Sequence, residues 1–244
     1  MTPNTAALFA AFYLVSALLG PGLTPPEDTS PAEEIPAVSV VEAEPEMEPE
    51  PSYSGPQVPA QEAPAEDDYF ADAAFIGNSL VDGFRMYSGL SVCDYYAATS
   101  KTVFTVDEYI TQMSGKDYGK IYILLGINEI GYSMDRLMSA YGGVLDRLAA
   151  DHPDALIYVM GISPVSANKD AAGGSFTMAN VRRFNENLYE LAQEKECYYI
   201  DLCDALAGED GFLPANKTWD GIHFNASYYK VWLEYLQYHY IPAE

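Results

Sequence analysis

The chain has 244 residues, about half of them apolar, so it is long enough to bury one sizeable core. Acidic residues outnumber basic residues by 36 to 12, which gives a formal net charge of −24 at pH 7. This balance argues against a nucleic-acid partner and against an anionic membrane surface, because both require clusters of Lys and Arg. It favours a neutral or small substrate.

An apolar run, AALFAAFYLVSALLGPGL (6–23), opens the chain and ends at Gly-Pro-Gly. Its length lies between that of a signal-peptide core and that of a membrane span. We therefore expect residues 1–23 to be a signal peptide or an N-terminal membrane anchor. A mis-assigned start codon and a soluble helix are the remaining alternatives. The first two place the rest of the protein outside the cytoplasm, either secreted or tethered to a membrane.

The next segment is rich in Pro, Glu and Ala. Residues 1–68 contain 13 acidic residues and no Lys or Arg. Such a composition cannot bury enough apolar surface to offset the entropy lost on ordering. We expect residues 24–68 to form a disordered acidic linker and residues 69–244 to form the folded domain.

Apolar runs and amphipathic segments alternate along this domain. Buried strands are predicted at 73–77, 93–98, 120–126, 155–161 and 197–203. Helices are predicted at 79–87, 135–151, 178–196 and 226–240, and in the second of these Leu137, Tyr141, Val144, Leu145 and Leu148 share one face. Continuous apolar strands that alternate with helices indicate βαβ units. The prediction is an α/β fold, a three-layer α/β/α sandwich around a parallel sheet of about five strands.

Three polar clusters follow predicted strands or precede the last helix. They are Gly-Asn-Ser-Leu at 77–80, Gly-Ile-Asn-Glu at 126–129 and Asp-Gly-Ile-His at 220–223. Each alone has an ordinary structural explanation as a helix cap or a turn. Ligands of parallel sheets bind at the carboxyl ends of the strands, so we expect the loops to converge there.

Together the clusters hold the groups that acyl transfer requires. The Ser79 hydroxyl needs a general base, and His223 suits that role because histidine titrates near neutral pH. Asp220, three residues before His223, can orient the imidazole. The Asn128 amide is a suitable donor to the oxyanion of a tetrahedral intermediate.

These residues resemble the SGNH hydrolases, also called GDSL-type esterases and acylhydrolases. The resemblance covers the chain from about residue 68 onward and implies a flavodoxin-like sheet, with Ser79 as nucleophile and Asp220 and His223 completing a triad. It also implies an oxyanion hole made by the N–H groups of Ser79 and Ser100 and by the Asn128 amide. Ser100 stands where the family has glycine, and Asn78 and Glu129 each stand where it usually has Asp.

The expected function is a serine esterase acting through an acyl-enzyme on a small or carbohydrate-borne ester, such as an O-acetyl ester. An O-acyltransferase acting on a cell-surface glycan and a non-catalytic glycan-binding module are the alternatives. No cluster has metal-ligand spacing, so we predict no metal and no cofactor. The expected partner is a small-molecule or glycan ester, with no nucleic acid.

Overall fold

The computed structural model describes residues 55–242 of the chain. Within this range five strands form one parallel sheet in the order β2-β1-β3-β4-β5. The strands are β1 (Ala73–Gly77), β2 (Asp94–Ala97), β3 (Lys120–Leu124), β4 (Leu156–Met160) and β5 (Tyr198–Ile200). The predicted α/β fold with a parallel sheet of about five strands is confirmed.

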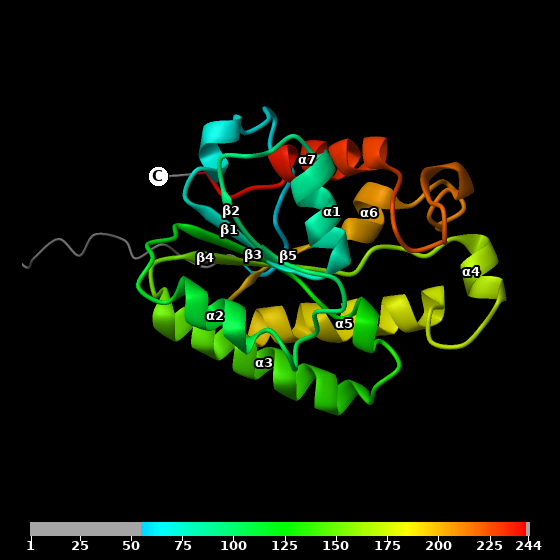
Figure 1. Cartoon of the computed structure of the whole chain (residues 1–244), viewed down its shortest axis with the longest axis horizontal. Coiled ribbons are helices and arrows are strands. Elements are labelled where there is room, and N and C mark those ends of the chain that lie inside the picture. The colour runs from blue at the N-terminus through cyan, green and yellow to red at the C-terminus, as the bar shows by residue number, and fades with distance from the viewer. Residues whose placement is uncertain (1–54, 243–244) are drawn as a thin grey trace, which may run out of the picture. The chain divides into compact units, whose positions relative to one another are not determined.

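Helices cover both faces of the sheet (Figure 1). On one face lie α1 (Ser79–Tyr87), α6 (Leu202–Leu206) and α7 (Tyr229–Tyr238), and on the other lie α2 (Asp107–Met113), α3 (Met134–Asp151) and α5 (Met178–Glu194). The short α4 (Ala167–Ala171) lies at the right of the view, beyond the sheet. All five residues of the predicted apolar face of α3 are buried, as the helical spacing requires.

An aromatic residue in register on every strand builds the core on the side of α1 and α7. The Phe75, Tyr122 and Tyr158 rings stack in parallel, with centroids 4.6 and 4.5 Å apart. Tyr95 and Tyr198 extend this row at its two ends. Since strands lie about 4.8 Å apart, in-register aromatics in a parallel sheet meet face to face.

The strand order reverses between β1 and β3. The chain runs from β1 outward to β2, and then returns across β1 to β3 and onward to β5. Loops on either side of such a reversal leave in opposite directions and open a crevice at the carboxyl ends of the two strands. Ser79 and Asn128, which follow β1 and β3, therefore belong to loops at this crevice.

The expected linker ends earlier than the composition suggested. Gln57 pairs with Tyr199 beside β5, and Ala60 pairs with His239 in antiparallel fashion. The backbone N–H groups of Gln61 and Ala65 donate to carbonyls of the last helix at 2.7 Å. Residues 55–68 thus belong to the folded domain. Backbone pairing and the burial of Val58 and Ala65 hold this segment in place, although its sequence has no apolar periodicity. The rest of the expected linker, and the expected signal peptide or anchor, lie outside the described residues.

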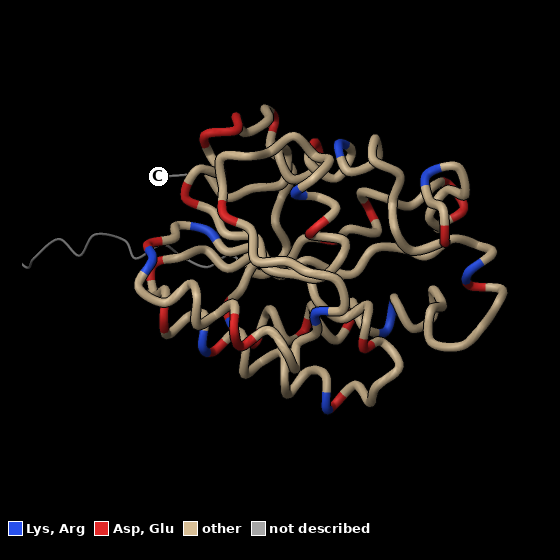
Figure 2. The backbone as a smooth tube through the Cα atoms, viewed as in Figure 1, with Lys and Arg blue, Asp and Glu red and all other residues tan. Residues whose placement is uncertain are grey.

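Charged residues lie mostly on the helices and loops that surround the sheet (Figure 2). Between residues 55 and 242 no helix combines the length and the apolar character needed to cross a membrane.

Candidate active site

Asn78 caps the helix that follows β1, and this leaves the neighbouring serine available. The Asn78 Oδ1 accepts a hydrogen bond from the Leu80 N–H at 2.9 Å, and the Asn78 backbone is extended, as the residue before a helix requires. Ser79 begins α1 and its hydroxyl has another partner. The side chain that caps the helix and the side chain that faces the site are therefore different residues.

Ser79, His223 and Asp220 form one chain of hydrogen bonds. The Ser79 Oγ lies 2.9 Å from the His223 Nε2, and the His223 Nδ1 lies 2.7 Å from the Asp220 Oδ2. With the ring proton on Nδ1, the imidazole donates to Asp220 and Nε2 accepts from the serine hydroxyl. The structure thus brings together the three residues predicted as nucleophile, base and orienting carboxylate, from positions 144 residues apart in the case of the serine and the histidine.

A tight turn holds Asp220 and His223 in place. The Asp220 Oδ1 accepts the backbone N–H groups of Ile222 and His223 at 2.9 and 2.8 Å. Gly221, directly after Asp220, has a φ of +86°, a conformation that favours glycine. A Cβ at this position would overlap Ser166 and Lys169. The Thr218 hydroxyl accepts from the Gly221 N–H and donates to the His223 carbonyl. The loop is therefore built around the carboxylate.

The same hydrogen bonds set the charge of Asp220. Partial burial opposes ionisation, but hydrogen bonds from the His223 ring and from the backbone N–H groups of His223 and Ile222 outweigh it. The pKa of Asp220 consequently lies below its ordinary value. An ionised Asp220 can stabilise the imidazolium that forms when His223 takes a proton.

The loops that carry Asn128 and Ser100 are tied to each other. Asn128 lies in the 3-10 turn η2 (Ile127–Glu129), directly after β3, and its Nδ2 donates to the Lys101 carbonyl at 2.9 Å. An amide nitrogen has two hydrogens, so this bond fixes the side chain and leaves a second N–H to donate elsewhere. Gly126 precedes the turn with φ of +120°, where a Cβ would overlap the Phe184 ring.

Ser100 adopts a glycine-like backbone conformation, with φ of +64°. Only one other residue besides glycine has a positive φ in the described range, Glu196 with φ of +53°. A glycine would adopt this conformation without the strain that a Cβ imposes. Ser100 is exposed and follows β2, next to the strand that leads to Ser79.

Glu129 has a structural role that the sequence did not reveal. Its carboxylate is buried and its Oε1 accepts the Val103 N–H at 2.7 Å, which adds a second link between the two loops. Burial raises the pKa of Glu129 to about 7, against the lowering effect of backbone N–H groups from Val103, Glu129 itself and Gly126. An acidic residue after an asparagine at a strand end was the only sequence signal for this link.

The other two histidines lie away from the triad. His152 ends α3, is buried and packs edge-on against Tyr118. His239 ends α7 and stacks on Tyr235, and its Nδ1 lies 2.9 Å from the Tyr235 carbonyl. Neither has a serine or cysteine side chain as a hydrogen-bond partner among the described contacts.

In the part of the chain that is described, no three His, Cys, Asp or Glu side chains gather to hold a metal.

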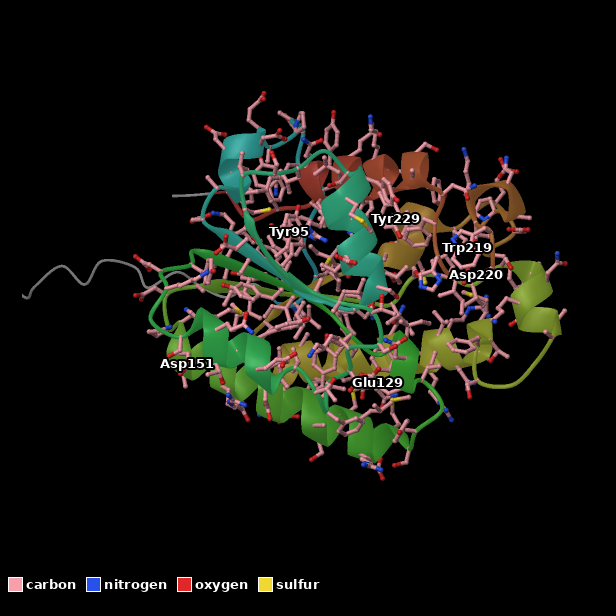
Figure 3. All side chains as sticks on the ribbon, viewed as in Figure 1. Tyr95, Glu129, Asp151, Trp219, Asp220 and Tyr229 are labelled. Carbon is pink, nitrogen blue, oxygen red and sulfur yellow. The ribbon has the colours of Figure 1, made fainter. Side chains whose placement is uncertain are left out.

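Two hollows compete as a substrate site. The larger, about 600 Å³, lies along α5 and β5, and its one thiol belongs to Cys203, whose pKa burial raises to about 12. Such a thiol is a poor nucleophile at neutral pH. The other, about 530 Å³, opens directly on Ser79 and His223. Figure 3 shows Trp219 and Asp220 next to each other at this edge of the molecule. The chemistry points to the smaller hollow.

Comparisons with known proteins identify the family of the chain. The model of the GDSL-like lipase/acylhydrolase family matches residues 73–231, which include all three polar loops. No curated protein matches the chain. A solved structure from Streptococcus pneumonia, named for platelet activating factor, is 21% identical over 68% of this chain and 81% of its own, with a TM-score of 0.60.

Two further solved structures carry esterase names. An acetyl xylan esterase is 14% identical over 67% of this chain and 96% of its own, with a TM-score of 0.52. A carbohydrate acetylesterase from Sinorhizobium meliloti is 12% identical over 65% and 93%, with a TM-score of 0.51. At such identities the likeness shows the fold alone. The family model, however, spans more than half of the sequence. The chain belongs to the GDSL-like lipase/acylhydrolase family.

Proposed function

We propose that this protein is a serine esterase that hydrolyses a small or carbohydrate-borne ester, such as an O-acetyl ester, through an acyl-enzyme. The observation that carries the proposal is the hydrogen-bonded chain from the Ser79 Oγ through His223 to Asp220. The names of two structural neighbours, an acetyl xylan esterase and a carbohydrate acetylesterase, support an acetylated carbohydrate. The acidic balance of the chain supports an uncharged one.

In the first half of the reaction the Ser79 Oγ bonds to the ester carbonyl carbon while its proton passes to the His223 Nε2. The carbonyl oxygen becomes an oxyanion, for which the Asn128 amide and the N–H groups of Ser79 and Ser100 are the proposed donors. When the intermediate collapses, the bond from carbon to the alkoxy oxygen breaks. His223 gives its proton to that oxygen, and the alcohol leaves.

Water completes the cycle in the same site. Its oxygen bonds to the acyl carbon as His223 takes one of its protons, and the bond to the Ser79 Oγ then breaks. The proton returns to the serine and the carboxylic acid leaves. Asp220 stays ionised throughout and stabilises the imidazolium twice in each turnover.

The test is Ser79→Ala, assayed on p-nitrophenyl acetate. Activity should fall by at least about 10⁴-fold, as it does when a triad serine is removed. The thermal midpoint should stay near that of the native chain, because Asn78 and not Ser79 caps α1. Ser139→Ala, an exposed serine on α3, is the matched control and should keep full activity. A folded Ser79→Ala variant that retained esterase activity would overturn the proposal.

A second measurement separates hydrolysis from binding without turnover. A serine-directed phosphonate should add one mass equivalent to the native chain and none to Ser79→Ala. If native protein hydrolysed no ester and took up no phosphonate, the glycan-binding alternative would replace the esterase. The extracytoplasmic location stays part of the proposal, on the apolar run at residues 6–23.

A further inference from the structure

One face of α1 forms the floor of the groove beside the triad. Ser79, Asp82, Gly83, Met86 and Tyr87 all line it, and residues three and four apart lie on the same side of a helix. Tyr87 lies eight positions after Ser79, so the groove extends about 12 Å along the helix from the nucleophile. The opposite wall comes from the segment 219–229, which includes Trp219 and His223, and Thr99 from the loop after β2 completes the lining.

Exposed aromatic and thioether side chains concentrate at this groove. Trp219 is 73% exposed, Met86 53% and Tyr87 46%. They are three of the four most exposed large hydrophobic residues at positions 55–242, and the fourth is Tyr132. The Trp219 ring stacks nearly parallel to the His223 ring, with centroids 5.6 Å apart. Exposed apolar side chains that gather around one cleft mark a binding surface.

The groove lies on the side of the site where the alcohol must leave. His223 returns its proton to the alkoxy oxygen, so that oxygen lies next to the His223 Nε2. Asn128 and Ser100, the proposed oxyanion donors, follow β3 and β2 and are not among the residues that line the groove, and their loops contribute only Thr99 to it. The part of the substrate in the groove is therefore the alcohol and not the acyl group.

Polar groups line the groove beside the apolar side chains. Asp82, whose Oδ1 accepts from Arg85, faces the groove one helical turn from Ser79. Asn225 lines the other wall and is fixed by its hydrogen bond to the Asn216 carbonyl. Of the described residues that line the groove none is Lys or Arg, and Arg85 is paired with Asp82, so the lining offers no unpaired cation to a phosphate or carboxylate. Sugar rings combine apolar C–H faces with hydroxyl edges, which an aromatic face and carboxylate or amide groups complement.

We infer that the groove between α1 and the Trp219 loop binds the alcohol part of the substrate as an uncharged sugar, with the ester-bearing ring against Trp219 and the next sugar against Tyr87 and Met86. This inference rests on the proposed function for its orientation. It adds a binding site and a class of alcohol to that function.

The first experiment measures binding without turnover. The chain has two tryptophans, and Trp232 is fully buried, so a ligand in the groove should be reported by Trp219 alone. Acetylated methyl β-xylobioside added to Ser79→Ala should shift the emission to shorter wavelength and protect it from acrylamide. Trp219→Phe in the same background should remove the signal. No shift with the sugar, or a shift with methyl octanoate instead, would overturn the inference.

The second experiment measures selectivity between two acetate esters, acetylated methyl β-xylobioside and ethyl acetate. For Trp219→Ala and for Tyr87→Ala, kcat/KM should fall about tenfold more on the sugar than on ethyl acetate, mainly through KM. Trp219→Phe should restore most of the lost selectivity. Tyr238→Ala, which removes an exposed tyrosine on α7 away from the groove, should leave both esters unchanged. Equal losses on both esters would mean that Trp219 acts only through His223, and would overturn the inference.

The two proposals fail in different ways. If native protein hydrolysed neither ester while Ser79→Ala still bound the sugar, the esterase would be rejected and the sugar groove retained. If native protein hydrolysed ethyl acetate and the Trp219 and Tyr87 variants showed no change in selectivity, the esterase would stand and the groove would be rejected.

Discussion

Ser100 holds a left-handed backbone conformation without the glycine that normally relieves it. For a residue with a Cβ, that conformation costs on the order of 1–2 kcal/mol. Ser100→Gly should therefore stabilise the fold. The gain should be at most about 1 kcal/mol, because the greater freedom of glycine in the unfolded chain offsets part of the relieved strain. Since the backbone N–H remains, kcat should stay within about tenfold of the native value.

The control for Ser100 is Glu196→Gly. Glu196 also has a positive φ, and it lies between α5 and β5, away from the triad. Both variants should raise the thermal midpoint by a few degrees, and Glu196→Gly should leave kcat unchanged. A lower midpoint for Ser100→Gly would contradict the strain, and loss of its activity would contradict the proposal that residue 100 acts through its backbone N–H and not through its side chain.

Glu129 should make the stability of the protein fall as the pH rises. In the unfolded chain this carboxyl ionises near pH 4.5, whereas burial raises its pKa to about 7 in the folded state. Between these values the folded carboxyl keeps a proton that the unfolded one has lost, so the free energy of unfolding decreases from about pH 4.5 to about pH 7. Above pH 7 the full penalty applies, at most about 3 kcal/mol.

Glu129→Gln removes that penalty and keeps an oxygen for the Val103 N–H. Urea unfolding at pH 8 should show the variant to be more stable than the native chain, and at pH 4.5 the two should nearly coincide. Glu186→Gln, on the exposed face of α5, serves as control and should give no gain that depends on pH. If Glu129→Gln destabilised the fold equally at both pH values, the lost interaction would be structural and not a protonation effect.

Among the elements, the segment before η1 (Asp67–Phe70) is held to the domain by pairing and burial. Val58, 2% exposed, donates its N–H to the Tyr199 carbonyl, and Tyr199 in turn donates to Pro56. A chain that begins at Asp67 should therefore lose about 2–4 kcal/mol of stability relative to one that begins at Gly55, mostly from the exposure of apolar core. The chain that begins at Gly55 should match the full-length protein.

Limited proteolysis gives an independent readout of the same segment. A nonspecific protease should leave a stable core whose first residue lies near Gly55, because the backbone from Pro56 to Ala65 is paired. Cleavage that stopped near Asp67, with no change in the thermal midpoint, would show that the pairing contributes nothing.

How far the sequence predicts these elements depends on what holds each one. The five strands and the long α3 and α5 are recognisable because their apolar residues are continuous or recur at helical spacing. The short α2, α4 and α6 have too few turns to show a period. The segment at 56–66 is ordered by backbone hydrogen bonds to residues distant in the sequence. Such bonds leave no apolar periodicity from which the segment could be predicted.

The candidate site divides in the same manner. Ser79, Asn128, Asp220 and His223 belong to recognisable local clusters, and the structure places the serine, the histidine and the aspartate in hydrogen-bond contact. The oxyanion roles of Asn128 and Ser100 stay predictions. The sequence did not indicate a binding role for Trp219. Its exposure, about three-quarters, and its stacking on His223 are features of the three-dimensional structure alone.

For the whole molecule, the charge balance should govern which substrates approach. The chain carries a formal charge of −24, and the described lining of the groove contains no Lys or Arg, while its one carboxylate, Asp82, is paired with Arg85. An acetylated methyl glucuronoside, which is anionic, should have a kcat/KM that rises several-fold between about 10 and 150 mM NaCl as the repulsion is screened. The matching acetylated glucoside, which is neutral, should show almost no dependence on salt. A kcat/KM for the anionic ester that fell with salt would reveal an attractive patch near the groove.

The residues near the two ends of the described chain lie beside β5 and the end of α7, and none of them lines the groove beside the triad. Residues 57–65 lie beside Tyr199 and the end of α7, and the last described residues, in red, lie at the left of Figure 1, whereas Trp219 and Asp220 lie at the right of the same view in Figure 3. A partner protein fused at either end of the described chain, or a solid support coupled there, would therefore leave the groove accessible to solvent and substrate. Immobilised through its first described residues, the domain should act on an insoluble polymer as readily as on a dissolved fragment. A link placed at the Trp219 loop would block the polymer first.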